Sequence, residues 1–315
     1  IIDEKEILIM ADISAKQVVA LRERTGVGMM KCKEALVKTN GDIEKAVLLL
    51  REQGLAAAAK KASRIAAEGV IAIYNKNNIA VLVEVNAETD FVAKNEKFTT
   101  FANRIAEIVA INNPSDIEAL NEMEYETGKT VEDMRKEMVL VIGENISVRR
   151  FERLEGAVAT YNHGNGKIGV MALFNTELSV ASTEKFQLFG KDVCMQVAAL
   201  NPQYLSKEAV PADVIETEKT VLMAQIKNDP KTANKPEAVL EKMISGKLNK
   251  FYSENCLLEQ AYFKDESMTV AKYIASAEKE FGVDISLEKV VRFERGEGIQ
   301  KREDNFAEEV ANLTK

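Results

Sequence analysis

The chain has 315 residues, of which 46% are hydrophobic, and it carries a formal net charge of −8. This length and apolar content are enough to bury a sizeable core, and they indicate two or three domains. The acidic balance argues against a nucleic-acid-binding protein, because affinity for phosphate backbones comes largely from clustered cations. The one local basic cluster, Lys60, Lys61 and Arg64, is too small to provide it.

Nothing in the sequence has the pattern of a membrane span or a secretion signal. No apolar run approaches transmembrane length, and the charged residues near the N-terminus do not fit a secretory signal. We expect residues 1–11 to be an extension or the start of the chain, with Met10 as the natural start. Three widely spaced cysteines, Cys32, Cys194 and Cys256, favour reduced thiols in a cytoplasmic protein.

Residues 12–53 predict a bundle of three short helices. Ser14 and Gln17 form a capping-box pattern at the start of the first helix, and Asp42 suits the N-cap of the third. A bundle of this size has a thin core and is typical of an interaction module. We expect residues 54–68 to form a polar-sided helical linker to the rest of the chain.

Two methionines follow the turn at residues 25–28 of this bundle. Methionine side chains are pliable, so they suit both an irregular core and a binding surface. Two interpretations stay open: either one of Met29 and Met30 packs inward while the other meets a partner, or both lie in the core.

The loop at residues 87–95 is the most informative segment of the chain. It follows an apolar strand-like run at 79–85 and precedes a helix with Phe98 and Phe101 on its apolar face. Phe91 therefore lies on a strand-to-helix loop, where a large ring has no assured position in the core. The ring suits insertion into a partner's pocket, and the alternative is that it caps the core beneath the loop.

An internal duplication bears on this choice. Three segments recur after 87 to 89 residues: 69–75 as 156–162, 80–86 as 169–175, and 97–101 as 185–189. We therefore predict an α+β fold whose core has two related subdomains, the first at 69–155 and the second at 156–211 together with 255–300. The second copy has no aromatic residue at 176–180, where the first has Phe91, which favours a function for Phe91 over a packing role.

Helical patterns fill the rest of the second copy. Residues 212–254 predict an inserted antiparallel helical hairpin, with a bend marked by Pro230 and Pro236. The hairpin serves either partner contact or mechanical support. Apolar positions in residues 301–315 (Phe306, Val310 and Leu313) predict a C-terminal helix that packs on a neighbouring element or on a partner.

The sequence has few of the patterns that mark an enzyme. His163 is the only histidine, which leaves little for a histidine-based triad or a multi-histidine metal site. No phosphate-binding loop pattern is present, so we expect no bound nucleotide or other cofactor. Residues 164–169 satisfy the pattern G-x-G-x-x-G, but a strand-like run follows where a dinucleotide site needs a helix, which favours a hairpin turn.

Four segments in the same order along the chain closely resemble translation elongation factor Ts. They are residues 21–36, 89–95, 142–146 and 292–298. The resemblance implies a ubiquitin-associated-type fold for the N-terminal bundle and a coiled-coil protrusion for the hairpin. It also implies a guanine-nucleotide exchange factor that binds elongation factor Tu and has no catalytic site of its own.

The resemblance also implies which residues contact elongation factor Tu. Thr89, Asp90, Phe91 and Val92 would disturb its magnesium and phosphate site, supported from the core by Ile142, Gly143 and His163. From the N-terminal bundle, the residues that would hold its nucleotide domain are Arg22, Met29, Met30 and Lys33. Phe263 and Lys264 would approach its third domain, although two apolar residues can occur at that pair in the family.

Two other classes of function stay open from the sequence alone. One is a small-molecule enzyme that uses a cleft between the two copies, with Asp90 as a base. The other is a ubiquitin-associated-type scaffold without exchange activity. A convex, exposed Phe91 would argue against the enzyme, and release of fluorescent GDP would distinguish the scaffold from an exchange factor.

Overall fold

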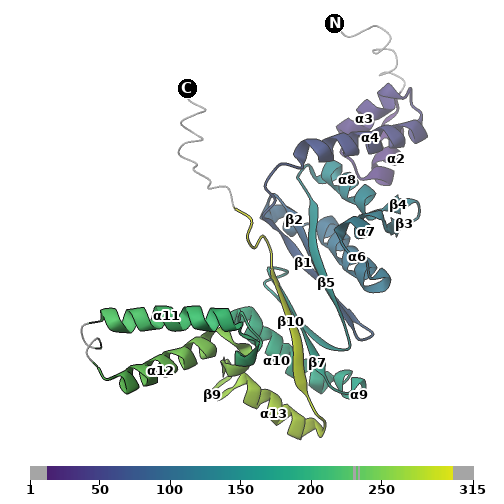
Figure 1. Ribbon diagram of the computed structural model, residues 1–315. Helices are drawn as coiled ribbons and strands as arrows, with labels where there is room; N and C mark the ends of the chain where they lie inside the picture. The colour runs from purple at the N-terminus through teal and green to yellow at the C-terminus, as the bar shows by residue number, and fades with distance from the viewer. Residues whose placement is uncertain (1–12, 230–231, 233–234, 301–315) are drawn as a thin grey trace. The chain divides into compact units, whose positions relative to one another are not determined.

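The computed structural model describes residues 13–229, 232 and 235–300, and it has an α+β fold (Figure 1). The predicted extension at 1–11 and the predicted C-terminal helix at 301–315 lie outside the described residues. The described chain divides into two compact units. The first contains the residues up to Ala72, Val83–Phe151 and the residues from Glu294 on, and the second contains Ile73–Leu82 and Glu152–Phe293.

The first unit begins with three helices, α2 (Ala15–Thr25), α3 (Met29–Lys38) and α4 (Ile43–Lys61). The predicted capping box is confirmed, because the Ser14 hydroxyl accepts from the Gln17 amide and the Gln17 side chain accepts from the Ser14 amide. The Asp42 carboxylate caps α4 by accepting from the amide of Lys45. Gly26 ends α2 in the left-handed region, with φ at 68°.

Helix α4 joins the N-terminal helices to the rest of the first unit. It runs without a break through residues 43–61, so one helix covers both the predicted third helix of the bundle and most of the predicted linker. Its buried Gly54 lies against the backbone of α8 (Val131–Ile142) near Lys136. Leu140 of α8 packs into the core of the bundle, among Leu21, Leu36 and Leu50. The bundle therefore shares its core with α8.

Three strands form the first sheet, in the order β1 (Glu68–Lys76), β2 (Ile79–Ala87) and β5 (Ser147–Glu155). The helices that follow β2 are α5 (Asp90–Ala93), α6 (Glu96–Asn112), α7 (Ile117–Glu122) and α8. A small hairpin of β3 (Glu124–Glu126) and β4 (Lys129–Thr130) precedes α8. The apolar face of α6 buries Phe98 and Phe101 completely or nearly so.

A buried carboxylate links the first sheet to the segment after the last strand. Glu84 of β2 is fully buried and accepts hydrogen bonds from Arg149, from Arg150 and from the amide of Gly296. A buried charge is tolerated only when it is paired and hydrogen-bonded. Gly296 has φ at 68°, and a side chain there would clash with the carbonyl oxygen of Ala67, so the close approach requires glycine.

The second sheet, in the second unit, has the order β10 (Ser286–Glu294), β7 (Ile168–Asn175) and β6 (Ala157–His163). Helix α10 (Glu184–Leu200) covers β6 and β7, and α9 (Leu178–Ala181) precedes it. The core here is aromatic: the rings of Phe174, Phe186 and Phe189 have centroids 5.3 to 5.6 Å apart.

The second unit also contains a pair of long helices, α11 (Ala212–Asn228) and α12 (Glu237–Asn255), which pack against each other (Figure 1). The remaining elements are the short helices η1 (Lys207–Ala209) and η2 (Leu257–Glu259), the strands β8 (Ala261–Tyr262) and β9 (Asp265–Thr269), and helix α13 (Val270–Phe281).

The same order of elements occurs twice. Helices α5 and α6 begin at residues 90 and 96, and α9 and α10 begin 88 residues later, at 178 and 184. Helix α8 and strand β5 begin at 131 and 147, and α13 and β10 begin 139 residues later, at 270 and 286. The offset rises from 88 to 139 residues because the second series includes α11 and α12 between α10 and α13.

Candidate functional site

Phe91 is the most exposed large hydrophobic side chain among the described residues, with 81% of its surface accessible. It lies on α5, a single helical turn between β2 and α6. The next two residues, Val92 and Ala93, are buried and fix the turn to the body of the unit. The interpretation that the ring caps the core is therefore wrong. Val92 itself offers little surface to a partner.

Hydrogen bonds to two carboxylates hold this turn. The amide and the hydroxyl of Thr89 both donate to the carboxylate of Glu144, at 3.0 and 2.7 Å. In the opposite direction, the carboxylate of Glu88 accepts from the amide of Asn145 at 2.6 Å. The Thr89 hydroxyl also accepts from the amide of Val92 and so caps α5. Sequence reasoning assigned no role to Glu144, although it lies within the family motif at 142–146.

Asp90 is half-exposed and ion-paired with Lys94 one turn later, at 2.7 Å. The hydrogen bond from Lys94 lowers the pKa of this carboxyl below its ordinary value. A carboxylate with a lowered pKa is a weaker base. The position therefore disfavours the alternative in which Asp90 abstracts a proton from a small molecule.

A groove of about 400 Å³ runs from Phe91 to the end of α8. Its lining residues are Phe91, Val92, Asn95, Lys97, Val141 and Ile142. Gly143 ends α8 in the left-handed region, with φ at 89°, and its carbonyl oxygen accepts a hydrogen bond from Lys61. The structure thus brings Ile142 next to Phe91, although the two are far apart in the sequence. Sequence reasoning missed Asn95, Lys97 and Val141.

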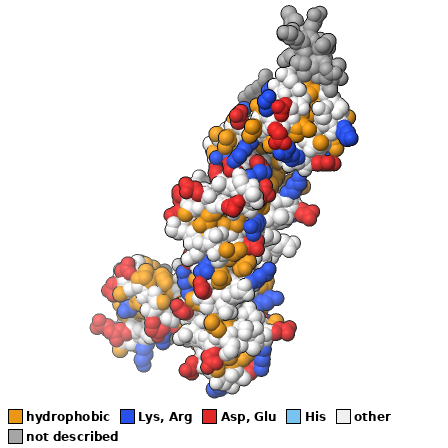
Figure 2. All heavy atoms as spheres, turned by 90° about the vertical axis from the view of Figure 1, so that its right-hand side faces the viewer, with side chains coloured by type: hydrophobic (Ala, Val, Ile, Leu, Met, Phe, Trp, Pro, Cys, Tyr) orange, Lys and Arg blue, Asp and Glu red, His pale blue; other side chains and the backbone are white. Residues whose placement is uncertain are grey.

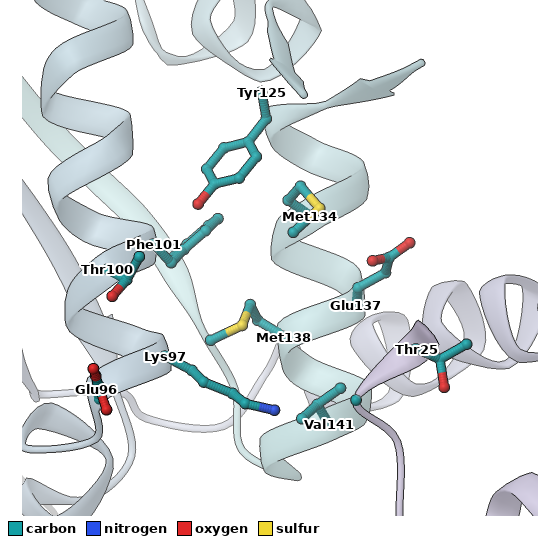
Figure 3. A pocket seen from close by; sticks show the side chains of 11 residues that line it. Thr25, Glu96, Lys97, Thr100, Phe101, Tyr125, Met134, Glu137, Met138 and Val141 are labelled. Atoms are coloured by element: carbon teal, nitrogen blue, oxygen red, sulfur yellow. The ribbon is translucent and has the colours of Figure 1, made fainter. Parts of the chain in front are cut away.

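A second cavity of about 390 Å³ adjoins this groove, and Lys97 and Val141 line both (Figure 3). Lys97 extends from α6 toward Val141 on α8. The cavity also includes Thr25, the last residue of α2, and Gly26, which ends that helix. The N-terminal helices, α6 and α8 therefore form one continuous surface that includes Phe91.

The predicted residues of the bundle lie on α2 and in the first half of α3. Arg22 is exposed and Lys33 is half-buried. Met29 and Met30 are 38% and 68% exposed. The interpretation that both methionines lie in the core is wrong: α3 buries Cys32, Ala35 and Leu36 instead, and both methionines reach the surface. A partner contact by one of them stays a prediction. Two exposed methionines at one helix start are suited to a contact that adapts to its partner.

The other three predicted site residues belong to the second unit. His163 is exposed at the end of β6, and its Nδ1 is 2.9 Å from the Tyr161 hydroxyl. The predicted hairpin turn is confirmed, since β6 and β7 pair as antiparallel strands with His163 opposite Ile168. Phe263 is 37% exposed in the turn between β8 and β9.

Lys264 is held by a carboxylate of α10. Its amino group lies 2.6 Å from both carboxylate oxygens of Asp192, and this hydrogen bonding raises the pKa of Lys264. The hydroxyl groups of Tyr262 and Tyr273 donate to the same carboxylate, and their rings are stacked. The turn that carries Phe263 and Lys264 therefore has a defined geometry.

Charges of both signs are interspersed over the face shown in Figure 2, with hydrophobic side chains between them. Within residues 13–229, 232 and 235–300, no group of three or more histidine, cysteine or acidic side chains is placed to hold a metal ion. In the same ranges, no helix combines the length and the apolar character that crossing a membrane requires.

Comparison with known proteins gives a consistent result. The family model described as Elongation factor TS matches residues 88–297. An Elongation factor Ts of Clostridium perfringens is 50% identical over 306 residues, which cover 96% of this chain and 99% of the relative. Those of Syntrophotalea carbinolica and Clostridium botulinum are 47% and 46% identical, over 96% and 95% of this chain and 99% and 98% of the relatives. This chain therefore belongs to the elongation factor Ts family.

Proposed function

We propose that this protein is a guanine-nucleotide exchange factor, which binds elongation factor Tu carrying GDP and promotes release of the GDP during translation elongation. Membership of the elongation factor Ts family supports the proposal. The observation that carries it is the exposure of Phe91 on a turn that is itself firmly held. An apolar ring that is 81% exposed and rigidly presented is suited to burial in another protein.

An exchange factor must bind the nucleotide-free form of its partner more tightly than the GDP form. By thermodynamic linkage, that preference weakens the binding of GDP by the same free energy. Moving a population from nearly all GDP-bound to nearly all open requires about 5.5 kcal/mol of differential binding. Burying one aromatic side chain contributes roughly 1.5–3 kcal/mol. Phe91 alone therefore supplies too little differential binding free energy, and other contacts around it must contribute the rest.

The surface next to Phe91 provides candidates for the remaining free energy. In our proposal, Asp90 and Phe91 enter beside the magnesium and phosphate site of elongation factor Tu, and Thr89 and Val92 fix their turn. Ile142 and Gly143 extend the same contact across the groove, to which Lys97 and Val141 also belong. The bundle residues Arg22, Met29, Met30 and Lys33 hold the nucleotide domain of the partner.

Three residues of the second unit complete the proposed contacts. His163 supports the binding of the core, and Phe263 and Lys264 approach the third domain of the partner. The fixed geometry of the turn that carries Phe263 and Lys264 supports their use as a contact. This protein itself would bind no nucleotide, and it would act in the cytoplasm, where translation takes place.

We also propose how the architecture serves this function. Helices α2 to α4 form a ubiquitin-associated-type bundle that binds the partner. The two series of strands and helices are related core subdomains, of which only the first carries the Asp90–Phe91 pair. Helices α11 and α12 form a coiled-coil insertion.

Replacing Phe91 by alanine tests the proposal. We expect F91A to slow the release of fluorescent GDP from elongation factor Tu at least tenfold, because it removes the apolar anchor, which corresponds to about 1.4 kcal/mol or more. The unfolding temperature should stay within about 1 °C of wild type, since an exposed side chain contributes little to the free energy of unfolding.

The matched control is I111A, which removes another exposed apolar side chain of the same unit and should leave GDP release unchanged. Wild-type exchange by a folded F91A would contradict the role of Phe91. A wild-type protein that binds elongation factor Tu but does not accelerate GDP release would instead support a scaffold.

A further inference from the structure

We propose that Glu144 is a positioning residue for exchange: its carboxylate holds the Thr89–Asp90–Phe91 turn in the geometry that enters the partner. This inference rests on the proposed function and names a residue that acts through Phe91 without touching the partner's nucleotide site. The observation is the pair of hydrogen bonds from the Thr89 amide and hydroxyl to the Glu144 carboxylate.

A single helical turn such as α5 gains little stability from its own hydrogen bonds, so its orientation depends on the contacts around it. Forming a first helical turn fixes several backbone dihedrals for a single hydrogen bond, so an isolated turn of four residues is unfavourable. Hydrogen bonds to an ionised acceptor are shorter and stronger than those between neutral groups. The 2.7 Å distance from the Thr89 hydroxyl to Glu144 fits such a bond, and the 3.0 Å distance from the Thr89 amide is that of an ordinary hydrogen bond.

The loop that carries Phe91 and the loop after α8 hold each other, because each provides a carboxylate that accepts from the backbone of the other. Glu144 accepts from the backbone of the Phe91 loop, and Glu88 accepts from the backbone of Asn145 in the loop after α8. The Asn145 side chain, in turn, donates to the carbonyl oxygen of Arg64 at 2.8 Å. The orientation of the Phe91 turn is thus tied to the end of α8, and Ile142, across the groove from Phe91, lies on that end.

The second copy gives an internal comparison. There, Glu177 stands at the N-cap of α9 and makes no side-chain capping bond, whereas Thr89 caps α5. Glu144 follows the terminal glycine of α8, and Val283 follows the terminal glycine of α13 and packs against the apolar core. The copy that lacks the exposed phenylalanine also lacks the carboxylate. Turn stability alone therefore does not require Glu144, because α9 forms without an equivalent.

The test is a double-mutant cycle on GDP release, with the variants E144Q, F91A and E144Q/F91A at saturating concentrations of exchange factor. Glutamine keeps the size of Glu144 but turns an amide donor toward one of the two Thr89 donors. We expect E144Q to slow release by about fivefold to tenfold, in line with the net loss of one hydrogen bond. In the F91A background the same change should slow release less than twofold, because the turn then has no ring to position.

The charge-matched control is E107Q on α6, where Glu107 pairs with Arg104, and this variant should exchange like wild type. Hydrogen exchange of the free protein gives a second readout, in which the amides of residues 89–93 should exchange faster in E144Q.

Each outcome is decisive. Wild-type GDP release by E144Q, or an equal slowing in the presence and absence of Phe91, would overturn the positioning role. Unchanged amide exchange at 89–93 would overturn it as well. A wild-type protein that fails to accelerate GDP release would refute the proposed function, and this result is visible before any variant is measured.

Discussion

At the scale of single residues, the type of a residue does not reveal whether its side chain is exposed or buried. Phe91 lies on α5 and Phe101 on the following helix, α6, yet the first side chain is 81% exposed and the second 1%. The difference comes from the buried pair Val92 and Ala93, which occupies the inward face of the turn. Asp90, next to Phe91, is tied to Lys94 and so stays charged.

The pKa of Asp90 is a direct check on this local geometry. Because Lys94 lowers the pKa, the contribution of this pair to stability is present above the ordinary aspartate value of about 3.9 and is lost as the pH falls through the lowered pKa. A carbon-detected NMR titration should therefore find Asp90 ionised at pH values where an ordinary aspartate is half protonated.

The variant K94A should return the Asp90 pKa to its ordinary range, while K16A, which changes an exposed lysine of α2, should leave it unchanged. A titration of Asp90 at the ordinary value in the wild-type protein would show that the pair does not form in solution.

The sequence predicted the local parts of the site better than the long-range parts. The Ser14 capping box, the Asp42 cap and the hairpin turn before Ile168 depend on residues close in sequence, and all three are confirmed. The contact of Thr89 with Glu144 joins residues 55 positions apart, and no periodicity or spacing predicts it. The comparison of the two copies favoured an exposed Phe91, because a packing residue would be expected in both.

At the scale of elements, the limits of prediction lie where helices continue or pack. The sequence separated a bundle ending at residue 53 from a helical linker at 54–68, whereas α4 runs through both as one helix to Lys61, and its buried Gly54 lies against the backbone of α8. The methionines of α3 were ambiguous because an amphipathic pattern does not show which residues of a first turn are covered. Tertiary contacts decided both cases.

The segment after β10 provides a prediction at this scale. G296A should lower the free energy of unfolding by more than about 2 kcal/mol, because a side chain at this positive φ is strained and meets the carbonyl oxygen of Ala67. It would also disturb the amide that donates to the buried Glu84 carboxylate. Urea denaturation followed by circular dichroism measures the change.

A second glycine serves as the control. Gly246 lies exposed within α12 with open space around it, so G246A should leave stability unchanged or raise it by up to about 1 kcal/mol. A G296A protein as stable as wild type would mean that the backbone near Ala67 moves freely.

At the scale of the whole molecule, the chain builds two units that each have a hydrophobic core. The three cysteines are all free and fully buried, with Cys32 in the first unit and Cys194 and Cys256 in the second. Burial raises the pKa of Cys194, and it raises that of Cys256 to about 11, so both thiols are poor nucleophiles in the native state.

Thiol labelling can therefore follow the unfolding of each unit. In native buffer at pH 8, we expect all three cysteines to react with a disulfide reagent far more slowly than in urea. With increasing urea, Cys32 should react first, because the small core around it is easier to open than the aromatic core around Cys194. Single cysteine-to-serine variants assign each reaction, and simultaneous labelling of all three thiols would show that the molecule unfolds as one cooperative body.

The insertion of Leu140 among the leucines of the N-terminal helices has a practical consequence for exchanging parts between relatives. A junction at residue 53 would divide α4 between two proteins. Leu140 would then meet a core that does not match it, which leaves either an exposed leucine or a cavity among the N-terminal helices. A chimera in which the N-terminal helices come from another species should instead be joined beyond Lys61, and it should import the matching face of α8. Chimeras that keep α4 and the matching face of α8 together should fold. Their preference for the partner of one species should follow the source of the N-terminal helices.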